Sequence, residues 1–255
     1  GAGNENAIVN GDVLANDSDA DGDALSVNAV GGVAGNVGAA VTGSSGGTFV
    51  IQSNGNYSFN PGTAFDDLAI GETRTTSVSY TISDGQGGTS SATVTITVTG
   101  LNDTPQSTGI ATQNGIDNSP VTLDVSGNFS DLDSTDNLTF SAGGTLPPGL
   151  SINPITGVIS GTIAASASLS GPYSVIITAT DPYGASVSQT FTWNLVNPTP
   201  TANADTATIA TGVIGSGNVL TNDADPDGDS LTVNAVNGVA GNVGIAVAGS
   251  NGGSF

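Results

Sequence analysis

The chain has 255 residues with 22 acidic side chains, one Arg, no His and no Cys, and its net charge is −21 although only 9 % of its residues are charged. The shortage of basic residues excludes nucleic acid and anionic membrane surfaces as partners, because both are bound through Lys and Arg. Disulfides, Cys/His zinc sites and His- or Cys-dependent catalysis are excluded as well, which leaves carboxylate, amide, hydroxyl and backbone oxygens, the ligands of hard cations.

The first distinctive segment along the chain is an acidic loop at residues 16–23. Its alternate carboxylates can converge on one cation while Gly22 permits the turn, as in the first half of an EF-hand loop. Asn28 stands where the bidentate Glu of an EF-hand would be, so we expect a calcium loop of another fold. The alternative is a solvated acidic turn, but its carboxylates would repel one another with no basic residue nearby. The carboxylates belong to Asp17, Asp19, Asp21 and Asp23.

Two segments with period-two alternation follow, at residues 74–82 and 91–99. In the second, Val and Ile side chains point to one face and Thr side chains to the other, which is typical of a half-buried strand. Residues 83–88 lie between them, are rich in Gly and include Asp84. We therefore expect an antiparallel hairpin with one face in the core.

Pro-containing linkers at residues 101–105 and 196–200 divide the chain. The resulting pieces are residues 1–104, 105–198 and 199–255, and the first two have the usual size of an Ig-like domain. The linkers also carry side chains that can bind a cation through oxygen, namely Asn102, Asp103 and Asn197.

The middle piece repeats the plan of the first. Residues 173–180 and 186–195 alternate as strands around a turn that begins at Asp181. Trp193 alternates with apolar neighbours, so we expect it in the core rather than on a sugar-binding surface. A weaker acidic loop at residues 130–136 is a further calcium candidate. Its carboxylates belong to Asp131, Asp133 and Asp136.

The chain also repeats itself, because most positions of residues 14–49 are identical in residues 220–255. This internal repetition predicts a tandem array with a period of two domains. We expect residues 1–104 to form a domain that lacks its first strand, and residues 199–255 to form the N-terminal half of a second such domain. The repeat contains another acidic loop, with Asp223, Asp225, Asp227 and Asp229.

These patterns predict an all-β fold of tandem Ig-like or cadherin-like β-sandwich domains arranged end to end. In such an array, the turn before the last strand, the linker and an early loop of the next domain can meet, which would place calcium at the joints. Asp84, Asn102, Asp103, Asp181 and Asn197 are therefore candidate ligands at joints. For Asp84 and Asp181, turn chemistry alone is the alternative.

Two known families resemble these pieces. Residues 16–27, 71–73, 80–85 and 97–105 resemble the VCBS-type, cadherin-like Ig repeats of large bacterial surface proteins of the RTX type, and the likeness resumes through residues 201–255. The middle piece is similar to the dystroglycan-type cadherin-like repeat at residues 129–133, 146–152, 156–162 and 179–181. It departs from that pattern at residues 133–136, where relatives commonly carry Asp-Gly-Asp.

The resemblance implies stalk or extender domains of large adhesins at the cell surface and in biofilms, often exported by type I secretion. It implies an extracellular location and calcium (Ca²⁺) at loops and interdomain joints. It names no adhesive ligand.

We therefore expect a calcium-stabilised, non-catalytic spacer whose partners are neighbouring repeats of the same array. Direct membrane insertion is not expected, because no apolar run approaches the roughly 20 residues that span a bilayer. The alternative is a subunit of a self-assembling extracellular filament, in which another copy of the chain completes an open sandwich with a strand. A glycan- or ice-binding module is a third possibility. Enzyme activity is the least expected, because the adjacent carboxylates of Asp66 and Asp67 should diverge rather than form an acid–base pair.

Overall fold

The computed structural model of the chain describes residues 1–249, whose regular elements are β-strands and short 3₁₀ turns. Residues 250–255, which close the sequence repeat, lie outside the described part. The chain divides into two compact units. The first unit comprises residues 1–107, 129–139 and 179–187, and the second comprises residues 108–128, 140–178 and those from 188 onward. Two loops that follow residue 107 in sequence therefore belong to the first unit.

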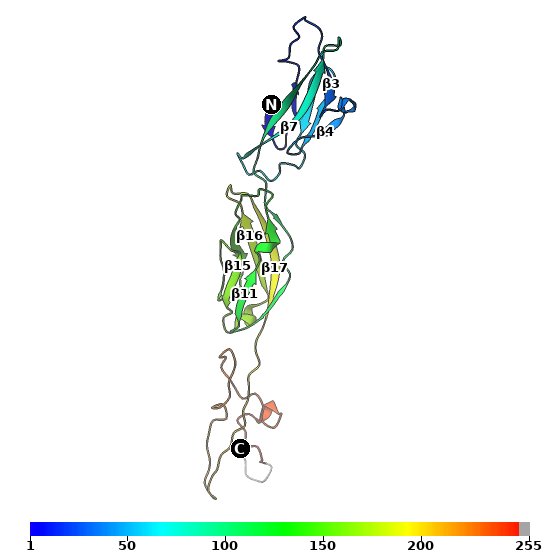
Figure 1. Cartoon of the computed structure of the whole chain (residues 1–255). Coiled ribbons are helices and arrows are strands. Elements are labelled where there is room, and N and C mark those ends of the chain that lie inside the picture. Colours follow the sequence, from blue (N-terminus) through cyan, green and yellow to red (C-terminus); the bar gives the residue numbers. More distant parts are fainter. Residues whose placement is uncertain (250–255) are drawn as a thin grey trace. The chain divides into compact units, whose positions relative to one another are not determined.

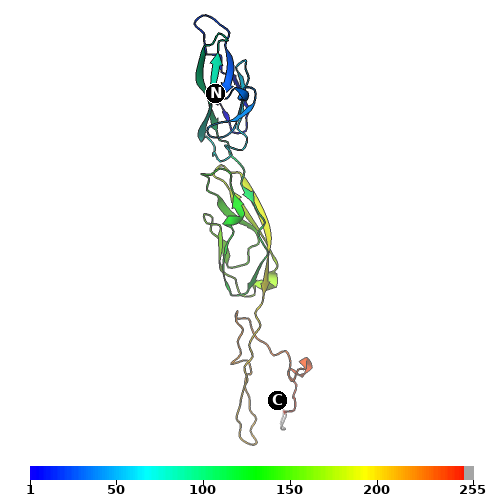
Figure 2. The same cartoon turned by 45° about the vertical axis from the view of Figure 1, so that its right-hand side comes forward.

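The first domain is a sandwich of two four-stranded sheets (Figures 1 and 2). One sheet has the order β1 (Ala2–Asn4), β8 (Thr89–Thr99), β7 (Thr73–Ser83) and β3 (Ser26–Val30). The other has the order β2 (Val9–Asp12), β6 (Asn56–Asn60), β5 (Thr48–Ile51) and β4 (Ala40–Thr42), and a 3₁₀ turn, η1 (Ala34–Asn36), precedes β4. β1 pairs with β8 in parallel, whereas the other neighbours are antiparallel.

The core of this sandwich confirms the predicted alternation. Ile96 and Val98 of β8 are fully buried, whereas Thr95 is exposed and Thr97 is half-buried. Three Phe rings fill the space between the sheets, with the centroids of Phe49 and Phe59 4.7 Å apart and those of Phe59 and Phe65 6.1 Å apart. Tilted and edge-on ring contacts of this kind stabilise a core beyond the area that they bury.

The second domain has a matching four-stranded sheet, in the order β10 (Gln113–Ile116), β17 (Ser186–Val196), β16 (Tyr173–Thr180) and β13 (Thr139–Gly144). β10 pairs with β17 in parallel, as β1 does with β8. A three-stranded sheet contains β11 (Pro120–Asp124), β15 (Val158–Thr162) and β14 (Leu150–Ile152), and a short ladder joins β12 (Phe129–Ser130) to β9 (Gln106–Ser107). Two 3₁₀ turns are η2 (Ser126–Asn128) and η3 (Ala167–Ser170). Trp193 is 2 % exposed, which confirms its expected core position.

Residues 197–249 hold no strand, only isolated bridges and the 3₁₀ turn η4 (Ala240–Asn242), and both views show this trace without a sheet (Figure 2). Val13 and Val27 of the first domain are 4 % and 3 % exposed, but their counterparts in the repeat, Val219 and Val233, are 52 % and 37 % exposed. In the first domain β2 and β3 pair with β6 and β7, whose counterparts this segment does not contain.

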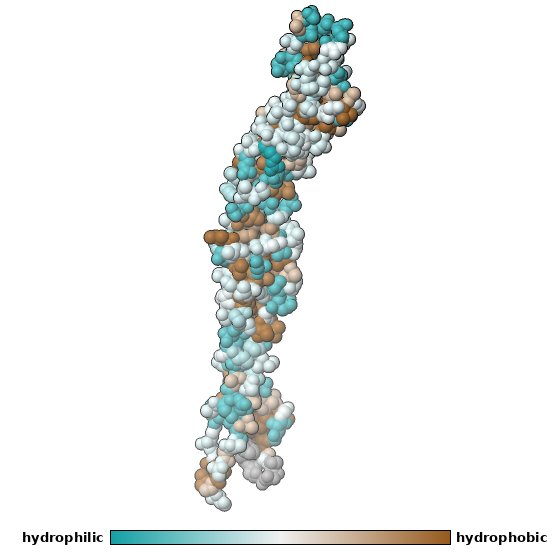
Figure 3. Space-filling view, in the orientation of Figure 1, coloured by the Kyte–Doolittle hydropathy of each residue, from teal (hydrophilic) through white to brown (hydrophobic). Residues whose placement is uncertain are grey.

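Exposed apolar side chains form separate brown patches among white and teal atoms on the face shown in Figure 3. Ile155 and Leu169 are among the most exposed. No helix within residues 1–249 is both long enough and apolar enough to cross a membrane.

Candidate metal centre

The three acidic loops adopt the same turn, in which a side-chain oxygen of one Asp accepts a hydrogen bond from the backbone N–H two residues later. Such Asx turns follow from the short side chain of Asp. The acceptor and donor residues are Asp19 and Asp21 at 2.8 Å, Asp131 and Asp133 at 3.1 Å, and Asp225 and Asp227 at 3.1 Å.

The central Asp of this turn differs in exposure from loop to loop. Asp21 is exposed, whereas Asp133 is 1 % exposed and Asp227 is 6 % exposed. The local sequence therefore sets the turn, and the surroundings decide whether its carboxylate is buried.

A first acidic cluster forms around Asp133, and all of its members belong to the first compact unit. It draws on the residue after β1, the loop before β7, the linker after β8, the loop after β12 and the residue after β16. We define this first acidic cluster as Glu5, Asp66, Glu72, Asn102, Asp103, Asp131, Asp133, Asp136 and Asp181.

Hydrogen bonds from the linker assemble this cluster. The Asn102 side-chain amide donates to Asp181 Oδ2 at 2.9 Å, and the backbone N–H of Asp103 donates to Asp133 Oδ2 at 2.9 Å. The backbone N–H of Leu101 donates to Glu5 Oε1 at 2.9 Å. The linker thus holds carboxylates from three other segments of the chain.

Several oxygens of the first acidic cluster are buried and accept no hydrogen bond. Burying a polar atom without a partner costs roughly 1–3 kcal/mol, and more for a charged group, so native structures contain few such atoms. Clustered unpartnered oxygens from carboxylates and an amide are the ligand set of a calcium ion. The atoms are Glu5 Oε2, Asn102 Oδ1, Asp131 Oδ2, Asp133 Oδ1 and Asp136 Oδ2.

The mutual proximity of these carboxylates also changes their proton affinity. Burial raises the pKa of Glu5, and the charges of Asp103 and Asp133 raise it further. Burial likewise raises the pKa of Asp103 and of Asp133, and the charge of Asp131 adds to both shifts. Without a counter-cation, the folded chain therefore resists full ionisation of this cluster.

Asp66 and Asp67 diverge, as expected from their adjacency. The carboxylate of Asp66 lies near Glu5 and Asp103 and raises the pKa of both, after the larger effect of burial. The carboxylate of Asp67 turns away and forms an ion pair with Arg74 at 2.6 Å.

Asp84 and Asp181 occupy equivalent hairpin turns. Oδ1 of Asp84 accepts hydrogen bonds from the backbone N–H groups of residues 86, 87 and 88, and Oδ1 of Asp181 accepts from those of residues 183 and 185. Oδ2 of Asp84 also accepts from the N–H of residue 88, so turn chemistry accounts for both oxygens of Asp84 but for only one of Asp181. Asp181 has an additional role, because its Oδ2 accepts from Asn102 within the first acidic cluster.

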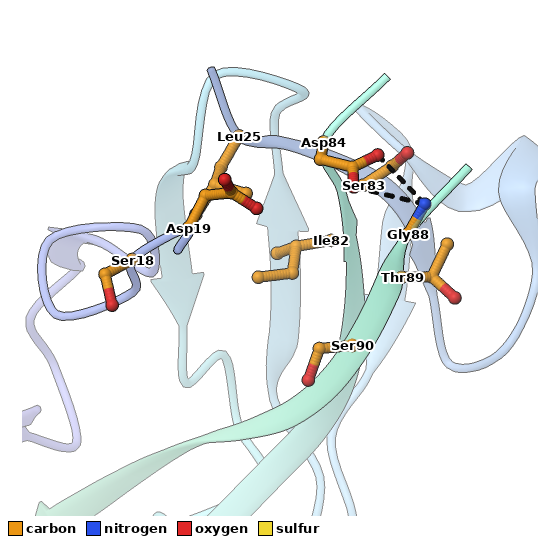
Figure 4. A pocket seen from close by; sticks show the side chains of 9 residues that line it. All are labelled: Ser18, Asp19, Leu25, Ile82, Ser83, Asp84, Gly88, Thr89 and Ser90. Carbon is orange, nitrogen blue, oxygen red and sulfur yellow. Dashed lines mark hydrogen bonds between the residues drawn. The ribbon is translucent and has the colours of Figure 1, made fainter. Parts of the chain in front are cut away.

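The loop at residues 16–23 lies beside an open pocket of about 230 Å³. Figure 4 shows Asp19 and Asp84 on opposite sides of Ile82, with Asp84 hydrogen-bonded to Gly88. Asp17 is held apart from them, because its carboxylate accepts a hydrogen bond from the Tyr80 hydroxyl at 3.3 Å. Asp23 is exposed, like Asp21. The structure thus brings Asp19 and Asp84 to one pocket but leaves the remaining carboxylates of this loop outside it.

A second acidic cluster, which we define as Asp225, Asp227 and Asp229, lies in the second compact unit. One carboxylate oxygen of each lies within 4.8 Å of the others. Both oxygens of Asp227 are buried without a hydrogen-bond donor, and the neighbouring carboxylate of Asp225, together with burial, raises the pKa of Asp227. Asp229 accepts a hydrogen bond from the Ser166 hydroxyl at 2.6 Å.

Two sequence-predicted residues of this region lie outside the second acidic cluster. Asp223 accepts a hydrogen bond from the backbone N–H of Asn203 at 2.7 Å, so it anchors the loop. Asn197 is exposed after β17. Their roles as ligands remain predictions.

The sequence patterns did not identify Glu5, Asp66 and Glu72 as members of the first acidic cluster. Glu5 and Glu72 are the two Glu residues of a chain whose other carboxylates are all Asp, and both lie in this cluster. The rarity of Glu could have identified these two residues as candidate ligands, because the Glu side chain is longer than that of Asp and can chelate a cation with both oxygens.

Family comparisons match three successive segments, which together cover all of the chain except residues 101–103. Residues 1–100 match the family described as "Bacterial cadherin-like domain", residues 104–196 match "Putative Ig domain" and residues 197–255 match "Bacterial Ig domain". None of the curated proteins matches the sequence.

Solved structures similar to the chain include cadherin ectodomains. Drosophila N-cadherin EC1-4 is 18 % identical with a TM-score of 0.33, covering 61 % of this chain and 40 % of that one. Mouse cadherin-23 EC22-24 is 15 % identical with a TM-score of 0.40, covering 58 % and 49 %. Human mucin-like protocadherin EC1-2 is 14 % identical with a TM-score of 0.43, covering 58 % and 78 %. The chain thus spans less than half of the N-cadherin and cadherin-23 structures.

The matched families set a general frame for the site. Ig-like and cadherin-like repeat domains are typically extracellular and typically non-catalytic. Cadherin-like domains commonly bind calcium, and the chain carries clustered Asp side chains that can do so.

Proposed function

Because the chain consists of bacterial cadherin-like and Ig-like domains in tandem, we propose that it is a non-catalytic, calcium-stabilised extender segment of a large secreted or surface-anchored bacterial adhesin. The observation that carries this proposal is the set of buried oxygens in the first acidic cluster that accept no hydrogen bond. A divalent cation bound there would supply the partner that these oxygens lack.

The charge of the chain supports the same conclusion. A net charge of −21 opposes compaction, and each bound Ca²⁺ cancels two of those charges. A ligand that binds only the native state stabilises it by mass action. Oxygen-ligand sites of extracellular modules have dissociation constants of about 10⁻⁴–10⁻³ M, so they fill outside the cell and stay empty in the cytosol. A chain of this kind would gain stability on export.

The role as an extender is supported by where the ligands come from. The linker contributes Asn102 and Asp103, and the loop after β12 contributes Asp131 and Asp133. A cation held by both would tie the linker to the loop that follows it. The joint would then be ordered only when calcium is present.

The non-catalytic part of the proposal rests on composition. The chain has no His, Cys or Lys to act as a base or nucleophile at neutral pH. The carboxylates of the adjacent acidic pair lie in different surroundings, because Asp67 is paired with Arg74 whereas Asp66 lies near Glu5 and Asp103.

Thermal unfolding of the full chain in millimolar CaCl₂ and in EGTA tests this function. We expect a higher midpoint in calcium for the wild type and a much smaller calcium effect for Asp133→Asn. Asp124→Asn is the matched control, because Asp124 is exposed in an Asx turn outside both acidic clusters. Identical unfolding of the wild type in the two buffers would refute the proposal.

A further inference from the structure

Glu5 and Asp117 occupy the same backbone position in their domains. Each directly follows the strand that pairs in parallel with the last strand of its domain, β1 or β10. The N–H of Glu5 donates to the carbonyl of Thr99 at 3.1 Å, and that of Asp117 donates to the carbonyl of Val196 at 3.2 Å. Both side chains are 2 % exposed.

Their carboxylates, however, have different partners. Glu5 leaves Oε2 unpartnered in the first acidic cluster. Asp117 is hydrogen-bonded by Ser168, whose backbone N–H lies 2.9 and 3.1 Å from its two oxygens and whose hydroxyl donates to Oδ2 at 2.6 Å, so neither oxygen is without a partner. The side chain of Asp117 is also one methylene shorter. The carboxylate of Asp117 therefore binds the turn η3 and is not available to a cation.

The second linker, like Asp117, offers fewer groups to a cation site than its counterpart in the first domain does. Counted from Thr99 and Val196, the positions of Leu101, Asn102 and Asp103 in the first linker are taken by Pro198, Thr199 and Pro200 in the second. Proline has no N–H, so Pro198 cannot donate the hydrogen bond that Leu101 gives to Glu5. At the positions of Asn102 and Asp103 the second linker therefore has neither an amide nor a carboxylate side chain, and its own Asn197 is exposed outside the second acidic cluster.

The second acidic cluster also lacks a counterpart of the Glu72 side chain. Glu72 directly precedes β7, and its Oε1 accepts a hydrogen bond from the hydroxyl of Thr135 at 3.3 Å. Pro172 directly precedes the corresponding strand β16 and offers no side-chain oxygen. What remains around Asp227 is the triad of the second acidic cluster itself.

We infer that the second acidic cluster is a separate cation site with fewer ligands than the first acidic cluster. It binds one Ca²⁺ and fills only at a higher calcium concentration than the first acidic cluster. This inference rests on the proposed calcium function and adds an order of filling to it. Asp227 marks the site as a real one, because it is 6 % exposed and both of its oxygens are unpartnered. Fewer charged ligands give a weaker calcium site, so we expect its half-saturating concentration to be at least about tenfold higher.

The two sites would therefore become ordered at different calcium concentrations. At calcium concentrations that saturate the first acidic cluster, the loop that carries Asp225, Asp227 and Asp229 would still lack its cation. It would become ordered only when calcium rises further.

Calcium titration of the full chain, followed by two-dimensional ¹H–¹⁵N NMR, tests the inference. The amides of Asp103 and Ser134 report on the first acidic cluster, and those of Asp227 and Gly228 report on the second. We expect two midpoints, with the second higher. Asp133→Asn should remove the first transition alone, and Asp227→Asn the second alone.

A gain of ligands provides the complementary test. The double variant Thr199→Asn/Pro200→Asp gives the second linker the side chains of the first, and both positions are exposed. We expect its second midpoint to fall severalfold toward the first, while the first midpoint stays unchanged. Isothermal titration should show the added affinity as well.

The outcomes separate the two proposals. Coincident midpoints for both clusters, or a second midpoint that the double variant leaves in place, would overturn the inference and leave the calcium function standing. The absence of any calcium-dependent shift at either cluster would overturn the proposed function, and the inference with it.

Discussion

The guanidinium of Arg74 donates two hydrogen bonds to the carboxylate of Asp67, at 2.9 Å from Nη1 and 2.6 Å from Nη2. The same guanidinium lies 5.8 Å from the ring centroid of Phe65. The carbonyl of Asp67 in turn accepts hydrogen bonds from the backbone N–H of Ser134 at 3.2 Å and from its hydroxyl at 3.0 Å. This ion pair therefore fixes the loop that carries Asp66 and Asp67. The loop after β12 contacts that same loop through Ser134.

Arg74→Ala should lower the free energy of unfolding by about 0.5–1 kcal/mol, a modest amount because both partners are partly exposed to solvent. Urea unfolding of Arg74→Ala, Asp67→Asn and the double variant gives the coupling energy of the pair. We expect that coupling to shrink at high salt. Additive effects of the two single variants would show that the pair contributes nothing.

Gly100 positions the start of the linker. Its N–H donates to the carbonyl of Glu72 at 2.9 Å, and a Cβ atom there would collide with the carbonyl oxygens of Leu68 and Ala69. Gly100→Ala should therefore cost about 1–3 kcal/mol and weaken the calcium effect on unfolding. Gly109→Ala is the control, since its Cβ would meet open space. Equal stability of the two variants would contradict this prediction.

Asp21 and Asp133 provide a matched pair, because both occupy the same place in an Asx turn but only Asp133 is buried. Asp133→Asn should abolish most of the calcium-induced rise in melting temperature. Asp21→Asn should leave most of it in place, because Asp21 is exposed and lies outside the pocket that Asp19 and Asp84 line. A calcium-dependent melt that is equally weakened in both variants would show that the exposed loop binds calcium as strongly as the first acidic cluster.

The calcium-free chain should become more stable on mild acidification. Burial raises the pKa of Glu5, Asp103, Asp133 and Asp136, so the folded state binds protons more tightly than the unfolded one. This stabilisation is complete below the ordinary carboxyl pKa of about 4 and is lost as the pH rises through the raised values. In EGTA we therefore expect a higher melting temperature near pH 5 than at pH 7.

Calcium and the variant Glu5→Gln serve as controls for that pH dependence. In saturating calcium the trend should reverse, because protons then compete with the cation for the same oxygens. Glu5→Gln removes one of the raised groups and should reduce the slope in EGTA. Stability in EGTA that falls steadily from pH 7 to pH 5 would contradict the prediction.

The strands could be predicted well because their side chains alternate with period two. Residues 173–180 and 74–82 correspond to β16 and β7, and the buried face of β8 is the one that its Val and Ile residues define. The 3₁₀ turns η1 and η4 show that neighbouring residues alone can determine a local structure. Asn36 and Asn242 each donate a side-chain hydrogen bond to the carbonyl six residues earlier, although only the first turn lies among paired strands of a two-sheet sandwich.

The candidate site could be predicted only in part. The acidic loop after β12 is visible in the sequence because Asp131 and Asp133 are two residues apart. Glu5 and Glu72 are distant in sequence, and the parallel pairing of β1 with β8 and the loop before β7 bring them to the same place. The difference between the two clusters is likewise set by tertiary contacts, since it depends on Ser168 reaching Asp117.

The parallel pairing at the edge of each sandwich determines how a domain would respond to tension. β1 enters the first domain and β8 leaves it, and the register joins Ala2–Asn4 to residues 97–99. β10 and β17 repeat this arrangement over Gln113–Ile116. A pull on the two ends of such a domain draws the paired strands past each other, so their hydrogen bonds are loaded together in shear rather than opened one at a time. The domain would therefore bear force at the ladder that joins its first and last strands.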